Sequence, residues 1–159
     1  MDYYVLKESL RQEVMRQLDF HKEWQDEEIA DIIDTAILKQ SREQYISTVT
    51  KLTLKQELFN GIRRLDILQE LLDDKDITEI MVNGSGSIYY EKNGSIDRFD
   101  KKFDSEEKLE AVIQQIVARA NRHVNEASPI VDTSLADGSR VNIVLKPIAL
   151  NGPIITIRK

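Results

Sequence analysis

The stretch that decides the fold is 128-SPIVDTSLADGSRVNIVLKPIALNGPIITIRK-159. Apolar residues alternate with polar ones in three short runs, which is the period of a β-strand with one buried face. Two turn signals, Asp137-Gly138 and Asn151-Gly152, separate the runs. The sequence therefore predicts three strands of an antiparallel sheet, near residues 130–135, 141–145 and 153–159.

The residues upstream predict three more strands. ITEIMV at residues 77–82 alternates well enough for a strand, and the glycine cluster NGSGS at 83–87 breaks it. This cluster lacks the Gly-Lys-Ser/Thr ending and the following helix of a phosphate-binding loop, so we interpret it as a turn. Asn93-Gly94 lies between two further apolar runs and is the strongest short hairpin signal, because both turn positions must tolerate positive φ.

Residues 105–123 predict one long amphipathic helix within this sheet region. Asp104 and Glu107 stand at capping-box spacing before it. Its apolar positions recur at intervals of three and four: Leu109, Val112, Ile113, Ile116, Val117 and Ala120. Strands segregated from a single helix indicate an α+β domain, an antiparallel sheet with one long packed helix, which we place at residues 73–159.

Residues 1–72 predict a small bundle of three or four helices. A third helix is expected to begin at Thr53, with Gln56 completing its capping box and Gly61 ending or bending it. Residues 67–72 predict a short fourth helix. The first two helices carry apolar stripes that we interpret as core rather than as a partner groove: Leu6, Leu10, Val14, Leu18, Ile29, Ile32, Ile33, Ala36 and Ile37.

Composition excludes several classes of function. The chain has 159 residues and a formal net charge of -6, which argues against a general nucleic-acid surface. It has no cysteine, and its only histidines, His21 and His123, stand far apart, so we expect no metal site. The acidic residues Asp73, Asp74, Asp76 and Glu79 lack the spacing of a calcium loop. No apolar run approaches the length of a membrane span.

Arg140 and Arg158 occupy polar positions of the second and third strands predicted in the closing stretch. Their neighbours in each strand are Val or Ile, so each guanidinium is expected on the face opposite the core. If the two strands are neighbours, the arginines can converge on one anion, because a guanidinium forks onto phosphate oxygens. From spacing alone, the simpler interpretation is a pair of solubilising charges on an exposed sheet face.

Three stretches together shift that balance: LLDDKDITEIMVNGSGSIYYEKNGSIDRF, IVARANRHVNEASPIVDT and LADGSRVNIVLKPIALNGPIITIRK. In this order and at this spacing, they resemble the N-terminal domain of CpaF-like ATPases, the pilus-assembly motors of tight-adherence systems within the type II/IV secretion ATPase superfamily. The resemblance runs from about Thr53 to Lys159, and residues 1–52 share only a charged helical character with it. It implies a helical region, then a PAS-like α+β domain, then a RecA-like ATPase domain beyond Lys159.

The same resemblance implies a division of labour. The family's Walker A and Walker B segments belong to the RecA-like domain, so we expect no catalytic residue in this chain and no ATP hydrolysis by it alone. ATP and Mg²⁺ are expected only with that motor domain. The family's nucleotide-facing arginines correspond to Arg140 and Arg158, and more weakly to Arg122, where relatives carry Gly-Arg-Arg and this chain reads Ala120-Asn121-Arg122-His123.

The expected partners are the chain's own motor domain, neighbouring subunits of a homohexamer and an inner-membrane platform protein, but no nucleic acid. The resemblance implies a cytoplasmic protein held at the inner face of the cell membrane through these partners. Two other functions remain open at this point. One is a stand-alone PAS-like sensory module that binds a small ligand, and the other is a structural adaptor that docks through its helical region.

Overall fold

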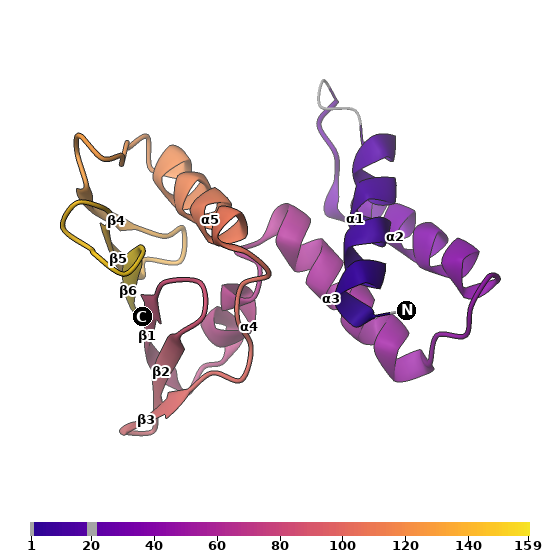
Figure 1. The fold of residues 1–159 in the computed structure, drawn as a ribbon, viewed down its shortest axis with the longest axis horizontal. Helices are drawn as coiled ribbons and strands as arrows, with labels where there is room; N and C mark the ends of the chain where they lie inside the picture. Colours follow the sequence, from indigo (N-terminus) through magenta and orange to yellow (C-terminus); the bar gives the residue numbers. More distant parts are fainter. Residues whose placement is uncertain (1, 19–21) are drawn as a thin grey trace. The chain divides into compact units, whose positions relative to one another are not determined.

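A computed structural model describes residues 2–18 and 22–159 of the chain, so His21 lies outside the described residues. The chain divides into two compact units, Met1–Asp66 and Ile67–Lys159, and Figure 1 follows the elements of each along the sequence. The sequence placed this division six residues later, between residues 72 and 73. Each unit has its own core and is described by itself.

The first unit is a bundle of three helices, α1 (Tyr3–Gln17), α2 (Asp26–Ser41) and α3 (Thr48–Arg63). The apolar stripes predicted for the first two helices form its core. The side chains buried there by α1 and α2, with Leu18 directly after α1, are Leu6, Leu10, Val14, Leu18, Ile29, Ile33, Ala36 and Ile37. Ile32 is partly buried against them, so the interpretation of both stripes as core is confirmed.

Helix α3 begins earlier than the sequence predicts. Its N-cap is Ser47, whose hydroxyl accepts a hydrogen bond from the backbone N–H of Thr50 at 3.1 Å. Thr53 lies inside the helix, where its hydroxyl donates to the carbonyl of Val49 at 3.1 Å. A hydroxyl can cap only from a non-helical backbone, and Ser47 offers one six residues upstream of Thr53. Gly61 neither ends nor caps the helix, which continues to Arg63.

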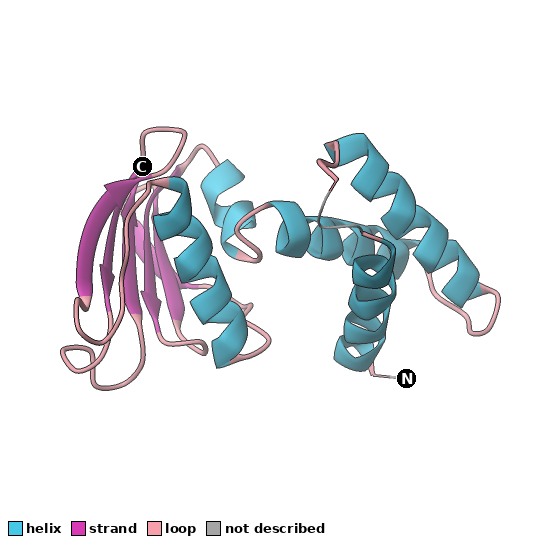
Figure 2. Cartoon of the chain, turned by 90° about the horizontal axis from the view of Figure 1, so that it is seen from above, coloured by secondary structure: helices cyan, strands magenta, loops and turns pink. Residues whose placement is uncertain are grey.

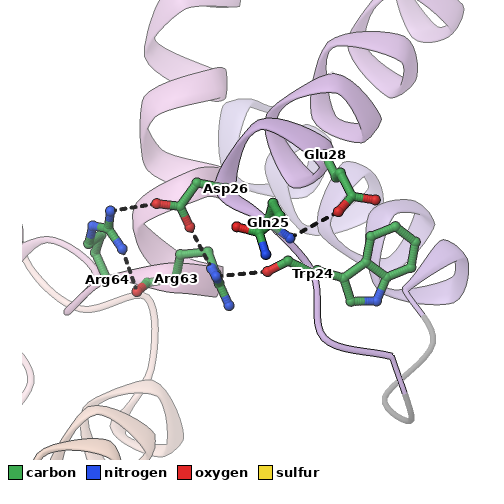
Figure 3. A network of polar contacts seen from close by, with 6 residues as sticks. All are labelled: Trp24, Gln25, Asp26, Glu28, Arg63 and Arg64. Atoms are coloured by element: carbon green, nitrogen blue, oxygen red, sulfur yellow. Dashed lines mark hydrogen bonds and ion pairs between the residues drawn. The ribbon is translucent and has the colours of Figure 1, made fainter.

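A charged cluster ties the start of α2 to the end of α3 (Figure 3). Arg63 Nε donates to Asp26 Oδ1 at 2.8 Å, and Arg64 donates to Asp26 Oδ2 at 2.8 Å. Arg63 also donates to the backbone carbonyl of Trp24 at 2.9 Å. The hydrogen bonds from Arg63 and Arg64 lower the pKa of Asp26 below its ordinary value. This cluster, Asp26 with Arg63 and Arg64, is called the Asp26 clamp.

The second unit is an α+β domain. Its strands form one antiparallel sheet in the order β3-β2-β1-β6-β5-β4. Figure 2 shows its two helices on the same side of that sheet. The predicted fold class is therefore confirmed. The elements are α4 (Leu68–Asp73), β1 (Ile77–Asn83), β2 (Ile88–Lys92), β3 (Ser95–Arg98), α5 (Glu106–Arg119), β4 (Ile130–Ser134), β5 (Arg140–Val144) and β6 (Ile154–Arg158).

The core of this unit lies between the sheet and its helices. Helix α5 begins after Ser105, whose hydroxyl accepts from the N–H of Lys108 at 3.1 Å, so the cap is one residue later than Asp104. One face of α5 is buried along its whole length, as its periodicity predicts. The most deeply buried side chains of helix and sheet are Leu109, Ile113, Ile116, Ile80, Val82, Ile143, Ile155 and Ile157.

Helix α4 belongs to the second unit because it is bonded to the sheet. Leu68 and Leu71 are buried. The ammonium group of Lys159, directly after β6, donates to the carbonyls of Leu71 at 3.3 Å and Asp74 at 2.5 Å. Lys92 of β2 donates to the carboxylate of Asp74 at 2.8 Å. These long-range contacts move the boundary ahead of α4, and no local sequence pattern reports them.

Both predicted turns around β2 are present. Asn93 and Gly94 join β2 to β3 with φ of 52° and 81°, the left-handed values that the Asn-Gly signal requires. The glycine cluster joins β1 to β2, with the N–H of Asn83 donating to the carbonyl of Ser87 at 2.8 Å. A Cβ at Gly84 would lie 3.1 Å from the carbonyl oxygen of Asn151. The cluster is thus a tight turn between strands and not a phosphate loop.

Candidate functional site

The candidate site lies on the face of the sheet that the helices of this unit do not cover. In β5, Val141 and Ile143 are buried, while Arg140, the first residue of the strand, is exposed. In β6, Ile155 and Ile157 are buried and Arg158 is exposed. Because side chains alternate along a strand, both arginines stand on the opposite face from the core. This part of the prediction is confirmed.

The two arginines are direct neighbours across the sheet. Strands β5 and β6 pair in a register that places Arg140 opposite Arg158. Directly opposed residues of an antiparallel pair have Cβ atoms about 4.5–5.5 Å apart, so both guanidiniums can reach one bound group. The side chain of Arg158 is 78% exposed. The condition set by the sequence, that these strands be neighbours, is met, and the two residues are called the arginine pair.

Only one carboxylate of the described residues approaches the arginine pair. Glu79 in β1 is the register partner of Arg158 on its other side, and its Oε1 lies 3.8 Å from Arg158 Nε. That distance allows an ion pair but exceeds hydrogen-bonding range. Within the described parts of the chain, Arg140 makes no ion pair. The pair therefore carries more positive charge than its immediate neighbours neutralise.

The turn before β5 holds Arg140 in position. The carboxylate of Asp137 accepts from the backbone N–H of Ser139 at 2.8 Å. The N–H of Leu135 donates to the carbonyl of Ser139 at 2.8 Å, which closes the β4–β5 hairpin. The hydrogen bond from the Ser139 backbone lowers the pKa of Asp137 below its ordinary value. Arg140 follows a fixed turn and not a loose loop.

Arg122 is not brought to the arginine pair. It lies in the turn after α5, where its backbone N–H donates to the carbonyl of Val117 at 2.8 Å. The chain then enters the sheet at Ile130, whose register partner is Val144. Arg140 lies at the other end of β5, opposite Ser134. The three arginines proposed from sequence therefore divide into an adjacent pair on β5 and β6 and one residue in the turn after α5, outside the sheet.

The arrangement suits the binding of an anion. Two guanidiniums on neighbouring strands present a broad set of N–H donors, and each can fork onto two phosphate oxygens. Glu79 was missed as a neighbour of the site, because its polar position in the run ITEIMV indicates a sheet face but not the pairing of β1 with β6. Across residues 2–18 and 22–159, no group of three or more acidic or histidine side chains is placed to hold a metal ion. No helix of the described chain is long and apolar enough to cross a membrane.

Comparisons with known proteins find relatives in secretion systems. The chain is 31% identical over 96 residues to the type IV secretion system protein PtlH of Bordetella pertussis, covering 60% of this chain and 28% of PtlH. It is 26% identical over 98 residues to a putative conjugal transfer protein of Mycobacterium tuberculosis, covering 58% and 28%. It is 34% identical over 101 residues to an uncharacterized protein of Methanocaldococcus jannaschii, covering 62% and 14%.

A solved structure from a secretion system also matches this chain in its fold. The VirB11 ATPase of the Brucella suis type IV secretion system matches with a TM-score of 0.52 and 25% identity, over 58% of this chain and 29% of that chain. No family model matches the chain. The chain spans less than a third of each of these proteins. It is thus similar, in sequence and in fold, to part of a type IV secretion ATPase.

Proposed function

We propose that residues 67–159 form a nucleotide-clamping and subunit-contact unit of a type II/IV secretion or pilus-assembly ATPase. The observation that carries this proposal is the arginine pair, Arg140 opposite Arg158 on an uncovered sheet face. Similarity to the VirB11 ATPase and to PtlH supports the placement among secretion ATPases. The finer assignment to CpaF-like pilus motors rests on the three sequence stretches that resemble that family.

In this proposal, ATP and Mg²⁺ are held mainly by a RecA-like motor domain that belongs to the same protein. Arg140 and Arg158 neutralise part of the phosphate charge from the opposite side. Because this interaction exists only when nucleotide is bound, nucleotide state biases how the unit sits against the motor domain. Hinge closure of this kind converts binding and hydrolysis into movement, which drives pilin assembly or protein export.

The proposed partners follow from this division of roles between the arginine-bearing unit and the motor domain. They are the motor domain, the neighbouring subunits of a homohexamer and an inner-membrane platform protein, which hold the protein at the inner face of the membrane. The helical unit is the proposed contact for the platform protein. Nucleic acid is not among the partners, since a net charge of -6 repels a phosphate backbone.

The proposal is tested in the protein at its natural full length. Arg140→Ala and Arg158→Ala should each weaken ATP binding about tenfold or more, since a charge-assisted hydrogen bond contributes about 1.5–3 kcal/mol. Steady-state hydrolysis should fall with it. Arg98→Ala is the matched control, because it removes the same charge from β3 of the same sheet. If both arginine variants keep the parent ATP affinity and turnover, the proposed nucleotide-clamping role of Arg140 and Arg158 is wrong.

A further inference from the structure

The arginine pair is part of a longer row of side chains on the same sheet face. The pairing registers align Arg140 of β5 with Arg158 of β6, Arg158 with Glu79 of β1, and Glu79 with Glu91 of β2. Neighbouring strands are about 4.8 Å apart. Two positive charges and then two negative charges therefore stand side by side across four consecutive strands. An anion bound to the arginine pair would therefore lie next to Glu79, which is on the strand adjacent to Arg158.

Glu79 is the more covered partner of this ion pair and Arg158 the more exposed one. The side chain of Glu79 is 24% exposed, whereas that of Arg158 is 78% exposed. The backbone of Glu79 is paired on both sides, with β2 and with β6. The 3.8 Å separation of Arg158 Nε and Glu79 Oε1 leaves the N–H donors of Arg158 uncommitted to this carboxylate. Attraction is present, but no hydrogen bond locks the pair.

We propose that Glu79 competes with bound phosphate for Arg158 and so limits the affinity of the arginine pair. Without anion, Glu79 offsets the repulsion between two arginines that stand directly opposite one another. With anion, the same carboxylate repels the phosphate oxygens at Arg158. Glu79 is thus a positioning residue that lets the pair release phosphate. This inference rests on the proposed function of the pair and deepens it.

The test uses this 159-residue chain and tripolyphosphate as the probe, at low ionic strength. Glu79→Gln keeps the size of the side chain and removes its charge, and it should tighten binding about two- to fivefold, the range that exposed ion pairs provide. Glu91→Gln is the matched control, since it removes the same charge one strand further away, and its affinity should stay closer to the parent. Affinities are read from the Nε–Hε resonance of Arg158 in ¹H–¹⁵N spectra.

The same resonance reports the pairing itself. In the absence of anion, Glu79→Gln should shift the Arg158 Nε–Hε signal and Glu91→Gln should leave it in place, which a merely structural role of Glu79 would not produce. In an Arg158→Ala background, Glu79→Gln should lose most of its effect on the affinity for tripolyphosphate, then measured by calorimetry. If Glu79→Gln does not fold, Glu79→Thr replaces it, because threonine suits a strand.

The outcomes separate the two proposals. If binding needs both arginines but responds equally to Glu79→Gln and Glu91→Gln, Glu79 does not compete with phosphate for Arg158. The proposed nucleotide-clamping role of the arginine pair would then still stand. If Arg140→Ala and Arg158→Ala leave tripolyphosphate binding unchanged, the arginine pair does not clamp the nucleotide. Binding by this chain is expected to be weak, because the proposed motor domain holds most of the nucleotide. Its complete absence from the parent and from every variant, even at saturating concentrations of tripolyphosphate, contradicts both.

Discussion

Two pairs of arginines in this chain differ in the groups that neutralise them. Arg63 and Arg64 in the helical unit share the carboxylate of Asp26, with a 2.8 Å hydrogen bond to each of its oxygens. Arg140 and Arg158 in the sheet face one another, and their one carboxylate lies 3.8 Å from Arg158. The first pair is satisfied from within the unit. The second is left with donors for a group from outside.

The difference separates an arginine pair that is neutralised within its own unit from one that we propose binds an anion. Like charges placed directly opposite on a sheet destabilise it by about 0.2–1 kcal/mol. A purely structural sheet gains nothing from that placement, whereas an anion site needs it. The Asp26 clamp has the opposite design, since one carboxylate satisfies both cations and holds two helices together.

The two faces of the sheet should differ strongly in how much their side chains contribute to the stability of the second unit. Ile157 is fully buried and Arg158, the next residue, is exposed. Ile157→Ala should lower the free energy of unfolding of the second unit by about 2–5 kcal/mol, because it opens a cavity in the core. Arg158→Ala should change that free energy by less than about 0.5 kcal/mol. Urea denaturation followed by circular dichroism measures both, and a large loss from Arg158→Ala would make the arginine pair structural.

A smaller effect tests the Asp26 clamp through pH. The pKa of Asp26 is lowered in the folded protein by its bonds to Arg63 and Arg64. Its stabilisation is therefore fully present above the ordinary pKa of an aspartate, near 3.8, and is lost as the pH falls through the lowered folded-state pKa. The difference in unfolding free energy between the parent and Asp26→Asn should be constant at neutral pH and shrink in acid.

This pH effect has a built-in reporter. Trp24 is the only tryptophan in the chain, and its carbonyl accepts from Arg63 of the clamp. Its fluorescence during urea unfolding follows the helical unit alone. A difference between parent and Asp26→Asn that does not change between neutral and acid pH would show that the clamp contributes nothing through ionised Asp26.

Local patterns predicted most of the fold because its elements obey short-range rules. The alternation of Val141 and Ile143 with polar neighbours fixed which face of β5 is buried. Asn93-Gly94 marked the β2–β3 hairpin through the positive φ that both residues adopt. The start of α3 was wrong, since Thr53 and Ser47 both precede apolar stripes and only the backbone outside the helix distinguishes a cap from a helical hydroxyl.

The pairing of strands that are distant in the sequence limited how much of the candidate site could be predicted. The polar positions of Arg140 and Arg158 could be predicted from alternation, but their register could not, because an irregular connection joins β5 to β6. The contact of Arg158 with Glu79 depends on the pairing of β1 with β6, the first and last strands along the sequence, which lie side by side in the centre of the sheet. No periodicity encodes such a pairing, which is why Glu79 emerged only with the sheet topology.

The most direct test of the central claim asks whether the arginine pair binds one anion. The chain is titrated with tripolyphosphate, against sodium chloride of matched ionic strength, while the Nε–Hε resonances of Arg140, Arg158 and Arg122 are followed. We expect Arg140 and Arg158 to move along a single saturation curve and Arg122, in the turn after α5, not to follow it. If Arg140 and Arg158 respond at different concentrations of tripolyphosphate, or not at all, the two arginines do not form one anion site.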